Sequence, residues 1–176
     1  MNFAKHLLDA LGECADEEKY NIIHEMLKDV FSDPKDIETE YLSIYLPFFG
    51  NDEEVEVWEA QRQELIKKAA QAGVVEAQYD YGITEFEREN YESSFELFAE
   101  SARFGFAPAL YCVGWAYFYG QGASVDKEKA LYYIELAAGQ LYSLAIDFLI
   151  HHYKDIDDKR ERYEMMLSWA EHESQV

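Results

Sequence analysis

Apolar residues recur every three or four positions along most of the chain, which places them on one face of an α-helix. Only three prolines and nine glycines interrupt this pattern. The expected helices cover residues 53–72, 75–88, 91–104, 107–119, 127–138, 142–153 and 156–172. The pattern therefore predicts an all-α fold.

Small residues return at fixed offsets within these helices. Ala70 and Ala102 are each followed by glycine three residues later, alanine seven later and glycine twelve later. A third segment keeps the alanines but carries Leu141 and Ile150 at the glycine positions. The spacing between copies is 32 and then 36 residues, and the extra four residues fall in the loop 120–126. This period is that of a helix-pair repeat.

The offsets have a physical reason, because antiparallel helices approach closely only where side chains are small. Gly73 and Gly105 fit the left-handed residue that ends a helix. Asn90 and Asp126 are N-cap types placed before helical segments. Helix crossings are expected at Ala77, Gly82, Ala109, Gly114, Ala130 and Ala138.

Residues 1–50 carry no copy of the repeat, although their apolar spacing is also helical. Asp33-Pro34 is typical of a helix start, and Pro47 and Gly50 would end that helix. The stretch 33–64 holds ten acidic and two basic residues, a net charge of −8. Since a solenoid needs its ends covered, residues 1–50 are expected to form an N-terminal helical cap, and residues 51–176 the repeats with a C-terminal capping helix.

A family resemblance follows from these residues. Its motif consists of Gly73, Ala77-Gln78-Tyr79, Gly82, Ala109-Leu110-Tyr111, Gly114, Tyr117, Tyr119-Gly120-Gln121-Gly122, Val125, Asp126, Lys129-Ala130 and Ala137-Ala138. Over about residues 65–153 the chain resembles Sel-one-like repeats, which are tetratricopeptide-related helix pairs. The resemblance implies a short right-handed α/α superhelical solenoid that binds other proteins on a concave surface and carries no catalytic residues.

The charge balance narrows the class of partner. The chain has 36 acidic and 15 basic residues, a formal net charge of −21, which repels nucleic acid and anionic membrane surfaces and attracts basic proteins. Alternatively, the acidity serves only solubility. No apolar run is long enough to span a membrane, and Asp9 comes before an apolar signal segment could form. We therefore expect a cytoplasmic protein.

Sequence motifs for chemistry are weak. His151 and His152 are adjacent, so on a helix they point about 100° apart and cannot chelate one metal ion. The glycine loop 120–122 lacks the lysine of a phosphate-binding loop. Cys14 and Cys112 lie in apolar helical patterns, as reduced buried thiols do. We expect no enzyme activity, metal or cofactor.

The aromatic residues of 107–119 allow two interpretations. They either belong to a central helix packed on both sides, or some of them line a groove and anchor a partner, since Tyr and Trp dominate binding energy at interfaces. Glu87 is expected beside such a groove. The candidate partner-binding residues are Tyr79, Tyr81, Tyr111, Trp115, Tyr119, Glu85, Glu89 and Glu92.

These observations favour a non-catalytic protein-binding module. One hypothesis is an immunity or inhibitor protein that neutralises a basic toxin or nuclease, a partner that its acidic surface would attract. The alternatives are a generic adaptor or scaffold, and self-association through the apolar stripe of helix 156–172. That stripe contains Tyr163, Met166, Leu167 and Ala170. The expected state is a monomer or a weak dimer.

Overall fold

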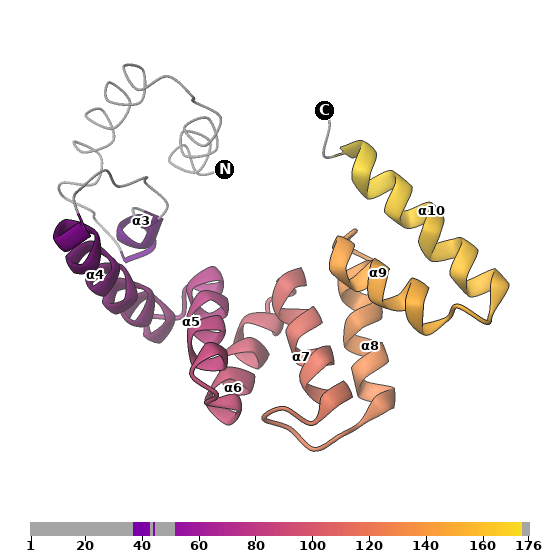
Figure 1. Ribbon diagram of the computed structural model, residues 1–176, viewed down its shortest axis with the longest axis horizontal. Helices are drawn as coiled ribbons and strands as arrows, with labels where there is room; N and C mark the ends of the chain where they lie inside the picture. The colour runs from indigo at the N-terminus through magenta and orange to yellow at the C-terminus, as the bar shows by residue number, and fades with distance from the viewer. Residues whose placement is uncertain (1–36, 43, 45–51, 174–176) are drawn as a thin grey trace. The chain divides into compact units, whose positions relative to one another are not determined.

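The computed structural model describes residues 37–42, 44 and 52–173, and no strand occurs among them. The all-α prediction is confirmed for this part of the chain (Figure 1). The helices are α3 (Ile37–Leu42), α4 (Asp52–Gln71), α5 (Val75–Glu87), α6 (Tyr91–Ala102), α7 (Ala107–Tyr119), α8 (Lys127–Ala138), α9 (Ser143–His152) and α10 (Asp157–Glu173).

The seven helices predicted from residue 53 onward are confirmed, with ends that agree within two residues. The helix predicted to begin at Asp33-Pro34 is helical where it is described, as α3, but its predicted start and the domain boundary predicted at residue 50 lie outside the described residues. The chain divides into two compact units, Met1–Ala77 and Gln78–Val176.

In the first unit, the short helix α3 packs against α4. Tyr41, Ile44 and Ile66 are buried, whereas Val55 and Val57 on α4 are exposed. The apolar residues of this unit therefore lie both inside and on its surface.

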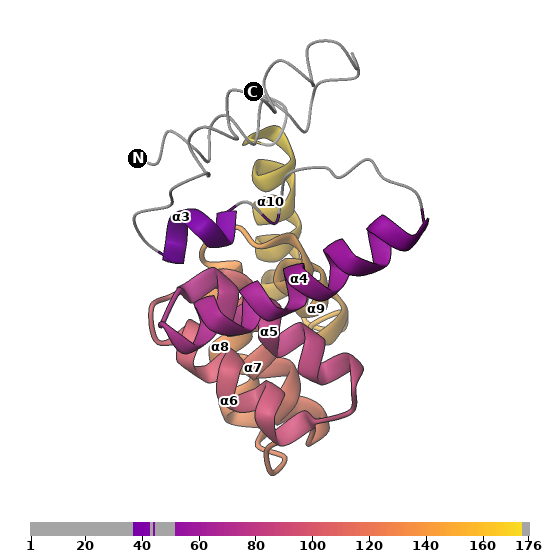
Figure 2. The same ribbon diagram turned by 90° about the vertical axis from the view of Figure 1, so that its left-hand side faces the viewer.

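In the second unit, each helix packs against the next one along the chain: α6 on α7, α7 on α8, α8 on α9 and α9 on α10 (Figures 1 and 2). One apolar core runs through these helices. Its fully buried members are Ala109, Ile134, Ala137, Ala138, Ala145, Ile146 and Leu149.

The predicted helix crossings are confirmed at two glycines of this unit. A Cβ atom added at Gly114 on α7 would lie 2.5 Å from Cγ1 of Ile134 and 2.9 Å from the carbonyl oxygen of Ala130, both on α8. At Gly82 on α5 it would lie 2.6 Å from the ring of Phe98 on α6. Contacts this short leave no room for a side chain, so these helices meet because glycine is present.

The turn prediction is also confirmed, since Gly73 and Gly105 have φ of 89° and 78°. In the part of the chain that the structure describes, two residues other than glycine adopt the left-handed conformation: Glu89 with φ of 65° and Leu141 with φ of 60°. Leu141 stands at the glycine position of the third repeat. The third copy therefore keeps the turn of the first two, at an unfavourable energy of about 1–2 kcal/mol.

Both predicted N-cap residues stand at the N-cap position of their helices, but only Asp126 caps with its side chain. The carboxylate of Asp126 accepts a hydrogen bond from the backbone N–H of Lys129 at 3.1 Å, and this bond lowers the pKa of Asp126. Asn90 precedes α6, but its side chain makes no capping bond. Its amide instead donates to Oε2 of Glu85 at 2.9 Å. The backbone of Asn90, with φ of −83° and ψ of 63°, is not in the extended conformation usual for an N-cap, so its side-chain oxygen is not set to accept from the N–H groups of α6.

The apolar stripe of α10 faces its own unit. Tyr163 is buried in the core, and Met166 and Leu167 pack against it. The hydroxyl of Tyr163 donates to Glu135 at 3.3 Å, and its ring stacks on Tyr153 at 6.0 Å. Most of the stripe predicted for self-association is thus covered within the chain; the side chain of Ala170 lies outside the described part.

Candidate functional site

A row of aromatic rings follows one face of α7. The ring centroids of Tyr111 and Trp115 are 6.0 Å apart, and those of Trp115 and Tyr119 are 4.4 Å apart. Residues four apart on a helix share a face, which is why the three rings meet. Tyr111 and Trp115 are half-buried, and Tyr119 is 52% exposed. The structure therefore brings together three of the predicted partner-binding residues.

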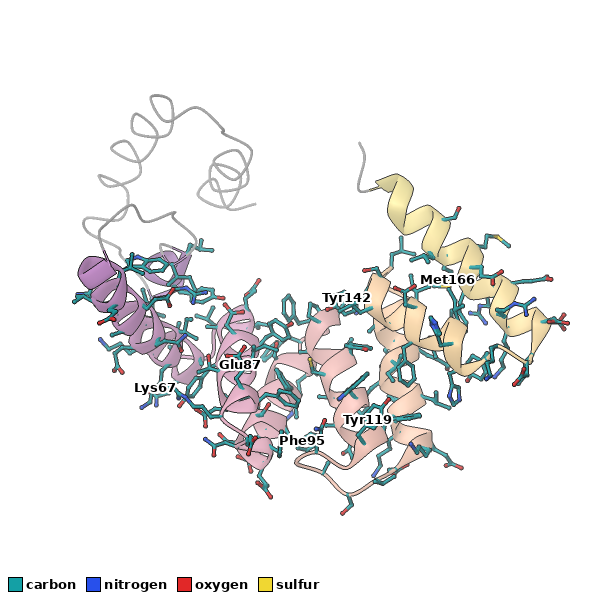
Figure 3. The ribbon with its side chains drawn as sticks, in the orientation of Figure 1. Lys67, Glu87, Phe95, Tyr119, Tyr142 and Met166 are labelled. Carbon is teal, nitrogen blue, oxygen red and sulfur yellow. The ribbon has the colours of Figure 1, made fainter. Side chains whose placement is uncertain are left out.

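Helix α9 and the turn before it extend this row. Tyr142 lies 5.8 Å from Tyr111, and Phe148 lies 6.2 Å from Trp115, both between ring centroids. Figure 3 shows Tyr142 and Tyr119 near opposite ends of α7. We call these five residues, Tyr111, Trp115, Tyr119, Tyr142 and Phe148, the α7–α9 aromatic surface.

The other two predicted tyrosines lie elsewhere. Tyr79 packs between Phe98 and Phe106, at 5.8 and 5.4 Å, and hydrogen-bonds the hydroxyl of Tyr142. Burial raises the pKa of Tyr79 above its usual value. Tyr79 is therefore a support beneath the aromatic surface. Tyr81 is half-buried and forms no ring pair with the aromatic surface.

The predicted carboxylates also separate into two kinds. Glu85 is only 7% exposed, and its oxygens are held by Arg88 at 3.0 Å and Asn90 at 2.9 Å. It is a structural group at the end of α5. Within residues 76–100, the exposed carboxylates that form no ion pair are Glu76, at the start of α5, and the group Glu87, Glu89, Glu92 and Glu96.

Charge changes abruptly along this part of the chain. Residues 76–100 contain eight acidic side chains and one arginine, a net charge of −7, whereas residues 107–125 contain no charged side chain. The single arginine, Arg88, is paired with Glu85. An acidic α5–α6 hairpin thus adjoins an uncharged, aromatic α7.

A pocket of about 220 Å³ lies where these two regions meet. Most of its lining side chains are half-buried, so it opens to solvent. It is lined by Ile83, Phe86, Ser94, Phe95, Phe98, Tyr111, Cys112, Trp115, Ala116 and Gln121. Sequence reasoning identified only the two α7 aromatics among them as functional candidates.

Three polar side chains of the pocket, Ser94, Trp115 and Gln121, are hydrogen-bonded within the chain. The hydroxyl of Ser94 donates to the carbonyl oxygen of Gly82 at 2.8 Å. The indole N–H of Trp115 donates to the side-chain oxygen of Gln121 at 3.1 Å. This leaves a mainly apolar interior with one amide at its edge.

The second unit contains the thiol of Cys112 and the imidazoles of His151 and His152. Burial raises the pKa of Cys112 to about 12, so its thiol stays protonated at neutral pH. Nδ1 of His151 contacts the carbonyl oxygen of Asp147, and His152 stacks on Phe148. No group of three or more His, Cys, Asp or Glu side chains within residues 37–42, 44 and 52–173 is placed to hold a metal ion. In the same residues, every helix is too short or too polar to span a bilayer.

The stability of the second unit should fall in alkaline solution. Cys112 is neutral when protonated, and the fold holds its proton up to about pH 12, while the unfolded chain releases it near the ordinary value of 9.0. Between these values the unfolded state binds fewer protons, so stability present below pH 9 is lost as the pH rises. Burial raises the pKa of Tyr111 to about 12 and adds to the effect.

We expect the free energy of unfolding to drop by about 1–2 kcal/mol between about pH 8 and pH 10.5 from the thiol alone. Denaturant unfolding at the two pH values measures it. The Cys112→Ala variant should show a smaller drop, and an equal drop would exclude the thiol as a cause.

The chain was compared with protein-family models, with curated proteins and with solved structures. None of them matches. The resemblance to Sel-one-like repeats therefore rests on the spacing of small residues and on the loop 120–126.

Proposed function

We propose that this chain is a non-catalytic module that binds another protein through the α7–α9 aromatic surface. The observation that carries the proposal is the row formed by Tyr111, Trp115 and Tyr119 on an uncharged helix. Tyr and Trp contribute most to binding energy because they bury large areas while losing little side-chain entropy. A protein with one partly exposed row of this kind has a surface suited to a partner.

A helical-repeat solenoid of the Sel-one-like type is part of this proposal. Two features support it: each helix of the second unit packs on the next, and the repeated glycines Gly82 and Gly114 sit at close helix contacts. In such a fold the first helices of successive repeats share one face. The contacts of Tyr142 with Tyr79 on α5 and Tyr111 on α7 agree with that arrangement.

The partner is a basic protein, and the encounter takes place in the cytoplasm. The net charge of −21 and the exposed, unpaired carboxylates on α5 and α6 support this choice. Such a surface accelerates association with a cationic protein and disfavours nucleic acid and anionic membranes. If the partner is a toxin or nuclease, the chain acts as its inhibitor; if not, it acts as an adaptor.

Trp115→Ala and Tyr119→Ala are expected to weaken partner binding by about 30-fold or more, the effect of losing an interface anchor. The full chain would be immobilised and exposed to proteins from the cells that produce it. We expect a stoichiometric basic partner that is released by salt and is lost with both variants. Binding constants would then be measured with the purified partner.

Tyr132→Ala is the matched control, because Tyr132 is 59% exposed on α8 and lies outside the aromatic surface. It should retain the partner. Equal capture by all three variants would exclude the aromatic surface, and capture of acidic proteins only, indifferent to salt, would exclude a basic partner. A concentration-dependent dimer in analytical ultracentrifugation, lost with Tyr119→Ala, would instead favour self-association.

A further inference from the structure

We infer that the pocket between α5, α6 and α7 receives one apolar side chain from a cationic segment of the partner. This inference rests on the proposed function and specifies its chemistry. The pocket borders the aromatic surface, since Tyr111 and Trp115 belong to both. A segment lying on that surface could therefore insert a side chain without leaving it.

The size of the pocket decides between kinds of occupant. Its volume is about 220 Å³. Sites for drug-sized ligands and cofactors measure about 300–1,000 Å³, whereas an apolar cavity of about 150 Å³ already holds benzene. The pocket thus has room for one Phe, Leu or Met side chain and is smaller than the usual site of a drug-sized ligand.

The lining selects an apolar occupant. Ile83, Phe86, Phe95 and Phe98 provide hydrocarbon surface from α5 and α6, and no lining residue is charged. Ser94 and Gln121 already use their oxygens within the chain. A charged or strongly polar group entering here would lose its hydration without gaining partners, which is unfavourable by several kcal/mol.

The carboxylates around the pocket favour a partner segment with Lys or Arg side chains on either side of the inserted apolar side chain. Glu87 follows the lining residue Phe86 in sequence, and Glu96 follows the lining residue Phe95. Both carboxylates are exposed and unpaired, as are Glu89 and Glu92. Lys or Arg residues flanking the anchor would meet these carboxylates, while an acidic segment would be repelled.

The test is selection from a displayed library of random peptides on the full chain. We expect enriched peptides to combine Lys or Arg with a single Phe, Leu or Met. Replacing that apolar residue with alanine in a synthetic peptide should weaken binding by about tenfold or more, as for an anchor residue. The peptide would then be titrated into the Trp58→Phe, Trp169→Phe double variant while tryptophan fluorescence is measured. Trp115 is the one remaining tryptophan of three, so a change in fluorescence would show that the peptide binds beside it.

Two pocket-filling variants, Cys112→Leu and Ile83→Phe, should each abolish peptide binding. Thermal unfolding identifies any variant that fails to fold, and the other variant then decides. Phe104→Ala, at a side chain that is 70% exposed and outside the pocket, is the control and should bind normally. Enrichment of acidic or uncharged peptides, no enrichment, or equal binding to folded filled variants would overturn the inference.

Comparing capture of the native partner by Tyr119→Ala and by the two pocket-filling variants distinguishes failure of this inference from failure of the proposed function. Tyr119 belongs to the aromatic surface but does not line the pocket. If Tyr119→Ala loses the native partner while the filled variants keep it, the inference fails and the proposed function stands. If neither change affects capture, both fail. If the selection yields no peptide but free indole binds in the pocket, the pocket is a site for a small apolar molecule and the inference is overturned.

Discussion

Replacing Gly122 with alanine is expected to lower the free energy of unfolding by about 3 kcal/mol, whereas the same change at Gly105 is expected to lower it by about 1 kcal/mol. The two glycines have nearly the same backbone conformation, with φ of 77° and 78°. Alanine is therefore equally unfavourable at both positions as far as the backbone is concerned. The difference comes from the surroundings.

A Cβ atom at Gly122 would overlap the carbonyl oxygen of Tyr91 and lie 2.9 Å from Cβ of Phe95, both on α6. At Gly105 nothing lies within 4 Å. The loop 120–126 is thus pressed against α6, and a methyl group would push it away. Since Gln121 and Phe95 line the pocket, the pocket should open at the same time.

Denaturant unfolding followed by circular dichroism measures both variants, with Gly105→Ala as the control for backbone strain. The fluorescence of Trp115 should also become more solvent-exposed in Gly122→Ala, because its indole hydrogen bond to Gln121 is lost. Equal destabilisation by the two variants would mean that the loop moves freely and does not pack on α6.

The helices and their crossings could be predicted from sequence because they depend on local spacing. An apolar period specifies a helix, and a small residue at a fixed offset specifies where its neighbour passes. Gly114 against Ile134 and Gly82 against Phe98 are such cases. Leu141 is a further example, because it adopts the left-handed backbone conformation that glycine has at this position in the other two repeats.

The site was predicted only in part, because it depends on which side chains of different helices meet. Tyr111, Trp115 and Tyr119 were found because one helix places them together. Tyr142 was missed because it enters from the turn before α9. Glu85 is predicted beside the groove, and its burial and its bonds to Arg88 and Asn90 cannot be read from the spacing of residues along the chain.

The largest single loss of stability is expected from Ile134→Ala, which should lower the free energy of unfolding by about 3–4 kcal/mol. Ile134 is fully buried on α8 and lies against Gly114 of α7. Gly114→Ala alone should be unfavourable by about 1–2 kcal/mol, because the contact with Ile134 outweighs a gain of about 1 kcal/mol in helix propensity.

The double variant tests whether these helices meet through this pair of residues. The new methyl group of Gly114→Ala would occupy space that Ile134→Ala leaves, so the double variant should be more stable than the sum of the single losses by about 1 kcal/mol or more. The steric clash of the added methyl group is only partly removed in the double variant, because the carbonyl oxygen of Ala130 remains 2.9 Å from the added Cβ. Combining Gly114→Ala with Ile146→Ala, at another fully buried isoleucine, on α9, should give additive losses. Additive losses in both pairs would show that α7 and α8 are not held in register by the contact between Gly114 and Ile134.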